Sequence, residues 1–196
     1  MYNKHMWKPW IFFVLVAWLS GCQTSGGGST AGRSAGVESL SQSQAELYQR
    51  ALNKLEEKEP KTAEGLLQSL VRERGDVAEL WVNLALSQYQ QAKWQTAEKT
   101  VDQTLVSFSR IPQAHNLAGL LAVEKGEFKK AEQHYLKAIA IDAEYTNALF
   151  NMALLQDVYL RNIASAVDYY NRYLQHAQDD EATKSWVDNL TQILAR

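Results

Sequence analysis

The stretch AHNLAGLLAVEKGEFKKAEQHYLKAIAIDA, from Ala114 to Ala143, decides the fold. Apolar residues recur every three or four positions on both sides of a short polar segment around Gly126, which is typical of two amphipathic helices. Gly119 and Ala131 are small residues within the two patterns. Small side chains let two helix backbones approach closely, so the stretch predicts a helix–turn–helix unit packed on itself.

The same pattern recurs along the chain. The alanines Ala63, Ala97 and Ala131 lie 34 residues apart, and Ala166 follows after 35. Each of these alanines is preceded in the sequence by a pair of residues, one large or aromatic and one small, which lie four positions apart. These pairs are Leu47 and Ala51, Trp81 and Ala85, His115 and Gly119, and Leu149 and Ala153. A period of this length resembles the tetratricopeptide repeat, a helix–turn–helix unit.

The resemblance implies an all-α fold, a solenoid of about four repeats over residues 44–178. We expect first (A) helices near 44–57, 77–91, 111–125 and 145–159, and second (B) helices near 60–73, 94–108, 128–141 and 163–177. Pro60 and Pro112 suit the first turn of a helix, and Gly75 and Gly126 suit left-handed positions at helix ends. One unit cannot bury its apolar face alone, so neighbouring units must stack.

Residues 179–196 follow the fourth repeat and predict one more helix. Asp179 and Asp180 can cap its start. Its apolar residues share one face; they are Trp186, Leu190, Ile193 and Leu194. A single apolar face is what the end of a solenoid needs. We interpret this segment as a capping helix, with a helix that docks a partner as the alternative.

The first residues have the features of an export signal. Lys4 and Lys8 precede ten apolar residues from Trp10 to Leu19, and small residues follow. Ten apolar residues are too few to span a membrane, which takes about 20. Residues 1–21 therefore predict a cleaved signal peptide.

The string Leu-Ser-Gly-Cys that ends at Cys22, the only cysteine, resembles the lipobox of bacterial lipoproteins. That resemblance implies cleavage before Cys22, lipidation of its sulfur and acylation of its new amino group. Lipoproteins that stay in the inner membrane usually have Asp after the cysteine, whereas this chain has Gln23. The resemblance therefore implies a cell-envelope protein that is anchored in the outer membrane and faces the periplasm. Residues 22–43 are then the lipidated cysteine and a flexible Gly/Ser linker. An ordinary export signal with an incidental cysteine is the alternative.

No catalytic constellation is present in the sequence. His115 takes the place of Trp81 one repeat earlier and is expected to pack, whereas His134 and His176 are expected at the surface. We predict no metal site, no cofactor and no small-molecule substrate. The net charge is −2 with no basic stripe, which argues against nucleic acid. An enzyme remains a distant alternative.

In the tetratricopeptide repeat family the A helices line the concave face, and peptides bind there. The positions of this sequence that match the inward positions of the family predict a partner-binding groove. The alternative is that about half of these residues pack A helices against each other. The groove residues are Tyr48, Leu52, Val82, Asn83, Leu86, Tyr89, Asn116, Leu120, Phe150, Asn151 and Leu154. The carboxylate clamp of chaperone-binding members is absent, because only Asn83 fits it.

The sequence thus predicts a membrane-anchored repeat scaffold that binds other proteins in the periplasm. Its lipobox, linker and repeats resemble those of the pilotins that support type IV pilus secretins, which usually carry six repeats rather than four. Other interpretations are an adaptor for cell-wall hydrolases or for outer-membrane protein assembly, and an inner-membrane scaffold.

Overall fold

A computed structural model describes residues 35–196, which form helices and contain no strand. The predicted signal peptide, Cys22 and most of the predicted linker lie outside the described residues. The first two repeats consist of α1 (Gln42–Glu56), α2 (Pro60–Glu73), α3 (Ala78–Gln90) and α4 (Trp94–Ser107). The next two consist of α5 (Pro112–Glu124), α6 (Phe128–Ile141), α7 (Thr146–Leu154) and α8 (Ile163–Leu174), and α9 (Glu181–Leu194) ends the chain.

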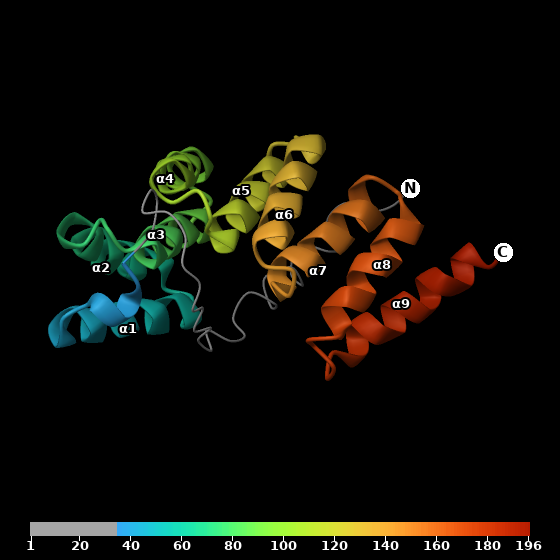
Figure 1. Cartoon of the computed structure of the whole chain (residues 1–196), viewed down its shortest axis with the longest axis horizontal. Helices are drawn as coiled ribbons and strands as arrows, with labels where there is room; N and C mark the ends of the chain where they lie inside the picture. Colours follow the sequence, from blue (N-terminus) through green and yellow to red (C-terminus); the bar gives the residue numbers. More distant parts are fainter. Residues whose placement is uncertain (1–34) are drawn as a thin grey trace. The chain divides into compact units, whose positions relative to one another are not determined.

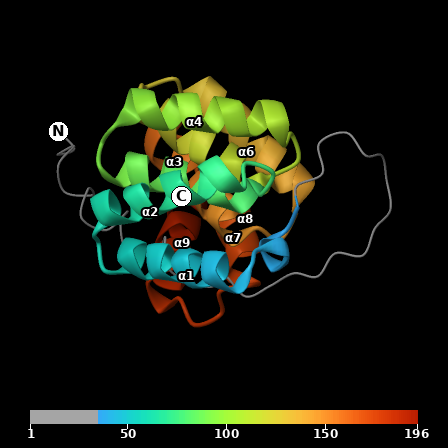
Figure 2. The ribbon, with the colours of Figure 1, turned by 90° about the vertical axis from the view of Figure 1, so that its left-hand side faces the viewer.

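Consecutive helices pack in pairs, as the repeat pattern predicts (Figure 1). Seen from the side of α1, successive pairs lie one behind another (Figure 2). The B helices begin at Pro60, Trp94, Phe128 and Ile163, which reproduces the spacing of the anchoring alanines. Pro60 and Pro112 each stand in the first turn of a helix. The all-α solenoid of four helix pairs is therefore confirmed.

The close contact inside each pair is made by the small residues. Ala63, Ala97, Ala131 and Ala166 are completely buried. Gly119 of α5 lies against the ring of Tyr135 in α6, which is itself 1 % exposed. A larger side chain at either kind of position would separate the two backbones, so the spacing of small residues determines how tightly each pair closes.

Each turn between an A and a B helix contains one residue in the left-handed region. These residues are Lys58 (φ 60°), Ala92 (φ 57°), Gly126 (φ 75°) and Arg161 (φ 58°). The prediction for Gly126 is confirmed. The prediction for Gly75 is wrong, because it is not among the residues with positive φ. Three of the four turns thus hold a side chain where glycine would be free of strain.

The fourth repeat accommodates its extra residue in a π-helical turn, η2 (Leu155–Tyr159), which continues α7. The amide of Leu160 donates to the carbonyl of Leu155 at 3.0 Å, and the amide of Asn162 donates to that of Gln156 at 2.8 Å. A π turn holds one residue more than an α turn, because its hydrogen bonds span five residues. The 35-residue step in the sequence therefore has a local structural cause, and the packing of α8 is preserved.

Residues 35–41 differ from the flexible linker expected there. Val37–Ser39 form a short 3-10 helix, η1, and Val37 and Leu40 pack against the core of the first repeat. The amide of Ala35 donates to the carbonyl of Asp76 at 3.0 Å. Arg74 donates to the carbonyl oxygen of Ser39 at 2.8 Å and to its hydroxyl at 2.7 Å. The segment thus covers apolar surface of the first repeat, and Ser41 then caps α1.

The last helix, α9, stands where the A helix of a fifth repeat would begin, because Thr146 and Glu181 are one long repeat apart. Val187 and Leu190 are buried against α8. Lys184 and Asp188 occupy the places of Leu149 and Ala153, which are completely buried in the fourth repeat. No described helix follows to cover that side of α9, so polar residues there are suited to a cap. Asp180 caps its start, as predicted.

Candidate functional site

The A helices α1, α3, α5 and α7 contact one another in sequence, and polar side chains connect them. Asn83 Nδ2 donates to the hydroxyl of Tyr48 at 2.7 Å. Asn151 Nδ2 donates to Asn116 Oδ1 at 2.9 Å, and the hydroxyl of Tyr89 donates to Glu124 at 3.3 Å. Each bond joins residues one repeat apart. Most of the amides predicted to bind a partner therefore also hold neighbouring A helices together.

Three of the predicted groove residues are buried. Tyr89 is 7 % exposed, Asn116 is 3 % exposed and Leu120 is 8 % exposed. The helices α3, α5 and α7 pack closely enough that these inward positions lie between them rather than on the surface. The alternative role in packing is the one observed at these three positions, and their contact with a partner stays a prediction.

The groove positions of α7 are occupied by the C-terminal helices. The ring of Phe150 lies 5.8 Å from that of Tyr170 and 5.0 Å from that of Tyr173. Phe150 and Leu154 pack against the cluster that includes Val187 of α9. Partly exposed Asn151 is bonded to α5. This end of the predicted groove is therefore filled from within the chain.

The open part of the predicted groove is the α1–α3 face, which consists of Tyr48, Leu52, Val82, Asn83 and Leu86. All five side chains are partly exposed. Tyr48, Leu52 and Leu86 rest on the core of the first repeat, so their outer surfaces are held in place. The face presents apolar surface beside one amide and one hydroxyl, which suits contact with a protein segment rather than chemistry on a substrate.

The hydroxyl of Tyr48 stays neutral at physiological pH. Burial raises the pKa of Tyr48 to about 12, and the nearby carboxylate of Glu79 adds to this effect, while the hydrogen bond from Asn83 opposes it. A neutral phenol that already accepts from Asn83 can still donate to a carbonyl. The α1–α3 face therefore offers a hydrogen-bond donor without offering a charge.

Sequence reasoning missed a buried polar network around Glu64, which is 8 % exposed. Its carboxylate accepts from Lys93 at 2.6 Å, from Gln91 at 2.8 Å and from Gln88 at 3.3 Å. Burial acts to raise the pKa of Glu64, but these donors together lower it below its usual value. The signal was present in the sequence, because Glu64, Glu98 and Glu132 each follow an anchoring alanine. Lys125 donates to Glu98, and Gln156 donates to Glu132, so the network recurs between repeats.

The two central histidines form a pair. His115 is buried, as predicted, and its Nε2 lies 3.2 Å from the carbonyl oxygen of Ser109. His134 is partly buried, not at the surface as predicted, and its ring lies 5.8 Å from that of His115. Burial, followed by the influence of His115 and Lys137, lowers the pKa of His134 to about 4. The exposed position predicted for His176 is confirmed.

Residues 35–196 contain neither a cluster of metal-ligating side chains nor a helix suited to cross a membrane. No group of three or more metal-ligating side chains comes together in this part of the chain. None of its helices has both the length and the apolar character to cross a membrane.

Comparisons with known proteins agree with this architecture. Residues 82–146 match the family model described as tetratricopeptide repeat. A 58-residue stretch is 38 % identical to the Protein O-mannosyl-transferase Tmtc3 of Drosophila melanogaster, covering 30 % of this chain but only 6 % of that relative's length.

Solved structures share the fold at low identity. A structure of pilF from Pseudomonas aeruginosa has a TM-score of 0.68 at 18 % identity, covering 78 % of this chain and 69 % of that one. A thermophilic repeat protein of Thermus thermophilus has a TM-score of 0.67 at 17 % identity, covering 77 % and 82 % of the two chains. The matching family model, the spacing of the helix pairs and these neighbours together show that residues 82–146 are tetratricopeptide repeat sequence and that the described helices form a solenoid of this fold.

Proposed function

We propose that this protein is a scaffold that binds a segment of another protein on the α1–α3 face. The observation that carries the proposal is the contrast along the A helices. The inward positions of α5 are buried. Those of α7 are partly exposed, as Leu52, Val82 and Leu86 are, but Phe150 and Leu154 of α7 pack against the cluster that α9 completes. Leaving apolar side chains partly in water costs stability, about 25 cal/mol per Å², so a persistent open face favours an interface.

The chemistry of the face suits an extended or helical segment with apolar side chains. Such segments bind repeat grooves through apolar anchors and a few polar contacts to their main chain. A similar fold, with a TM-score of 0.55 at 18 % identity, is the first repeat domain of Spaghetti (RPAP3), solved with an HSP90 peptide. Here Tyr48 and Leu52 stand where the carboxylate clamp would need charged residues. We therefore propose an internal apolar motif as ligand rather than a free chain end.

We further propose that a lipid on Cys22 anchors the scaffold in the outer membrane, on its periplasmic side. The lipobox string supports this, and the likeness in fold to pilF makes assistance to a type IV pilus or its secretin the pathway to test first. Substituting Cys22→Ser should abolish incorporation of a palmitate analogue without changing the helical circular dichroism. A serine variant that retains the label would overturn the anchor.

Photo-crosslinking tests the α1–α3 face directly. A benzoylphenylalanine placed at Val82 should crosslink a protein partner in cells, whereas the same residue at Val106 should not. Val106 is the matched control, because it is an apolar residue on α4 that is 88 % exposed. Equal crosslinking at the two sites, with products identified by mass spectrometry, would contradict the proposed interface. The variant Val82→Glu should then weaken capture of the same partner while its thermal melt stays at the wild-type temperature.

A further inference from the structure

The A–B turn of the fourth repeat differs in chemistry from the other three. In the first three turns, the two residues that immediately precede the left-handed residue are both polar. These pairs are Glu56 and Glu57, Gln90 and Gln91, and Glu124 and Lys125. In the fourth turn they are Tyr159 and Leu160. The extra residue of η2 falls in this turn, and π turns of this kind are frequent at functional sites. Both departures from the repeat pattern are thus found at one place.

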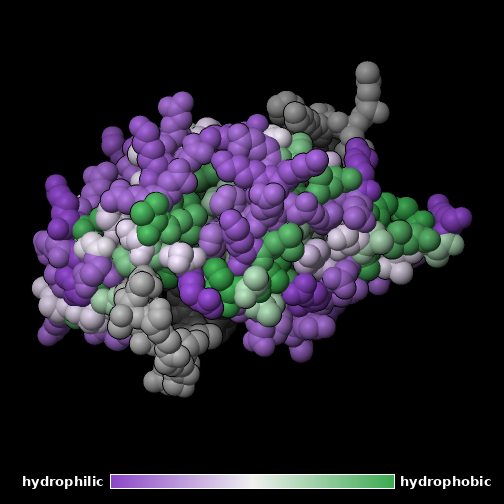
Figure 3. All heavy atoms as spheres, turned by 45° about the horizontal axis from the view of Figure 1, so that its top comes forward, coloured by the Kyte–Doolittle hydropathy of each residue, from purple (hydrophilic) through white to green (hydrophobic). Residues whose placement is uncertain are grey.

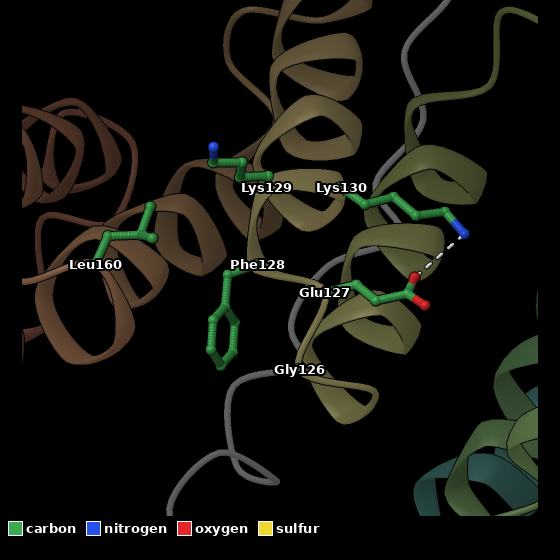
Figure 4. A pocket seen from close by; sticks show the side chains of 6 residues that line it. All are labelled: Gly126, Glu127, Phe128, Lys129, Lys130 and Leu160. Atoms are coloured by element: carbon green, nitrogen blue, oxygen red, sulfur yellow. Dashed lines mark ion pairs between the residues drawn. The ribbon is translucent and has the colours of Figure 1, made fainter.

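This turn contributes Leu160 to the lining of a shallow depression, and its exposed side chains Val158 and Tyr159 lie outside that lining. Val158 and Tyr159 are each 39 % exposed, and the ring of Tyr159 lies 4.7 Å from that of Phe128 at the start of α6. The depression has a volume of about 730 Å³ and is bordered by Phe128 and Leu160 from its two sides (Figure 4). On another view of the surface, hydrophobic side chains likewise form small separate patches among hydrophilic ones (Figure 3).

The charges at the depression determine what it can accept. Lys130 is paired with Glu127 at 3.3 Å, as the dashed line in Figure 4 shows. Lys129 also lines the depression and has no ion-pair partner among residues 35–196. An unpaired cation beside aromatic and aliphatic surface complements a carboxylate that neighbours an apolar side chain. A basic occupant would instead place like charges together, which is unfavourable.

We propose that the fourth A–B turn is a second docking site, which takes an acidic protein segment carrying a large apolar side chain. The apolar side chain enters the depression between Phe128 and Leu160 and covers Tyr159, and a neighbouring Asp or Glu pairs with Lys129. The site lies on the turns that join A to B helices, so it is separate from the α1–α3 face. It lets the scaffold hold two partners at once.

Fluorescence anisotropy of two labelled peptides on the full-length chain tests the proposal. The probe is fluorescein-Gly-Glu-Asp-Leu-Trp-Glu, and its charge-reversed control is fluorescein-Gly-Lys-Arg-Leu-Trp-Lys. The double variant Tyr159→Gln with Leu160→Lys restores residue types of the other turns, and Val106→Gln removes an exposed apolar residue elsewhere. The acidic peptide should bind the wild type saturably and the double variant about tenfold or more weakly. Lys129→Glu should reverse the preference between the two peptides.

Three results would overturn the second site. They are no saturable binding of the acidic peptide up to 1 mM, equal binding of both peptides, and the same affinity in the double variant as in Val106→Gln. The variant Val82→Glu distinguishes the two proposals. It should leave binding of the acidic peptide unchanged, and a loss of that binding in Val82→Glu alone would place the acidic segment on the α1–α3 face and remove the second site.

Discussion

Substituting Gly119→Ala should destabilise the protein, although alanine is the better helix former. A Cβ at this position would lie 2.6 Å from Cδ1 and 2.8 Å from Cζ of Tyr135, well inside contact distance. The ring is 1 % exposed and cannot move aside. Overpacking costs about 3 kcal/mol here, at the upper end of the usual range, and the helix propensity of alanine returns about 1 kcal/mol.

The expected net loss is about 2 kcal/mol, which lowers the melting temperature by roughly 4–8 °C for a chain of this size. Gly65→Ala is the matched control. Gly65 lies inside α2, and no atom would approach its added Cβ within 4 Å, so that variant should gain up to about 1 kcal/mol. Because both substitutions gain the same propensity, the difference between their free energies of unfolding isolates the steric cost.

Urea unfolding followed by circular dichroism at the helical band measures both variants. In a Tyr135→Leu background, Gly119→Ala should no longer destabilise the protein, because the obstructing ring is gone. The double-mutant cycle should therefore show a coupling of more than about 1 kcal/mol. The reasoning is refuted if Gly119→Ala unfolds at the same urea concentration as Gly65→Ala.

Three further predictions follow from the turns, the buried network and the histidine pair. Ala92→Gly should raise the free energy of unfolding by about 0.5–1 kcal/mol, because alanine is strained in the left-handed region; an unchanged urea midpoint would count against it. Glu64→Ala should cost about 2–3 kcal/mol, because the buried amide of Gln88 loses its acceptor, and a melt within 2 °C of the wild type would contradict this. His134 has a lower pKa when folded than when unfolded, so its contribution to stability is complete above pH 6.5 and is lost as the pH falls towards 4. Between pH 7 and pH 4.5 the free energy of unfolding of His134→Gln should therefore fall by about 1 kcal/mol less than that of the wild type, allowing for the partial exposure of the ring. Melts of both proteins at the two pH values measure this difference.

The repeat period is enough to predict where each B helix begins. Pro60, Trp94, Phe128 and Ile163 follow from the spacing of the alanines, because a small residue must recur wherever two backbones touch. The position of the extra residue could also be narrowed to between Leu149 and Ala166. The structure that accommodates this residue could not be predicted, because a longer loop and a π turn satisfy the same spacing.

The exposure of the A-helix positions was harder to predict. Whether Tyr89 faces a partner or a neighbouring helix depends on how closely α3 and α5 approach, and that distance is set by all side chains between them at once. The partial burial of His134 is hard to predict for a related reason, because its ring packs beside that of His115, which takes the place of Trp81 in the third repeat. The composition of residues 35–41 indicates a linker, yet two apolar side chains and the bonds from Arg74 are enough to fix them.

The docking of residues 35–41 determines the path of mechanical load through the protein. A pull on the chain ahead of Ala35 first reaches the bond between Ala35 and Asp76 and the pair of bonds between Arg74 and Ser39. Tension therefore enters at the turn between α2 and α3, and α1 is shielded while these bonds hold. If Arg74 is replaced by alanine, the point of loading moves towards Ser41, and unfolding under force should begin by peeling α1 from the solenoid.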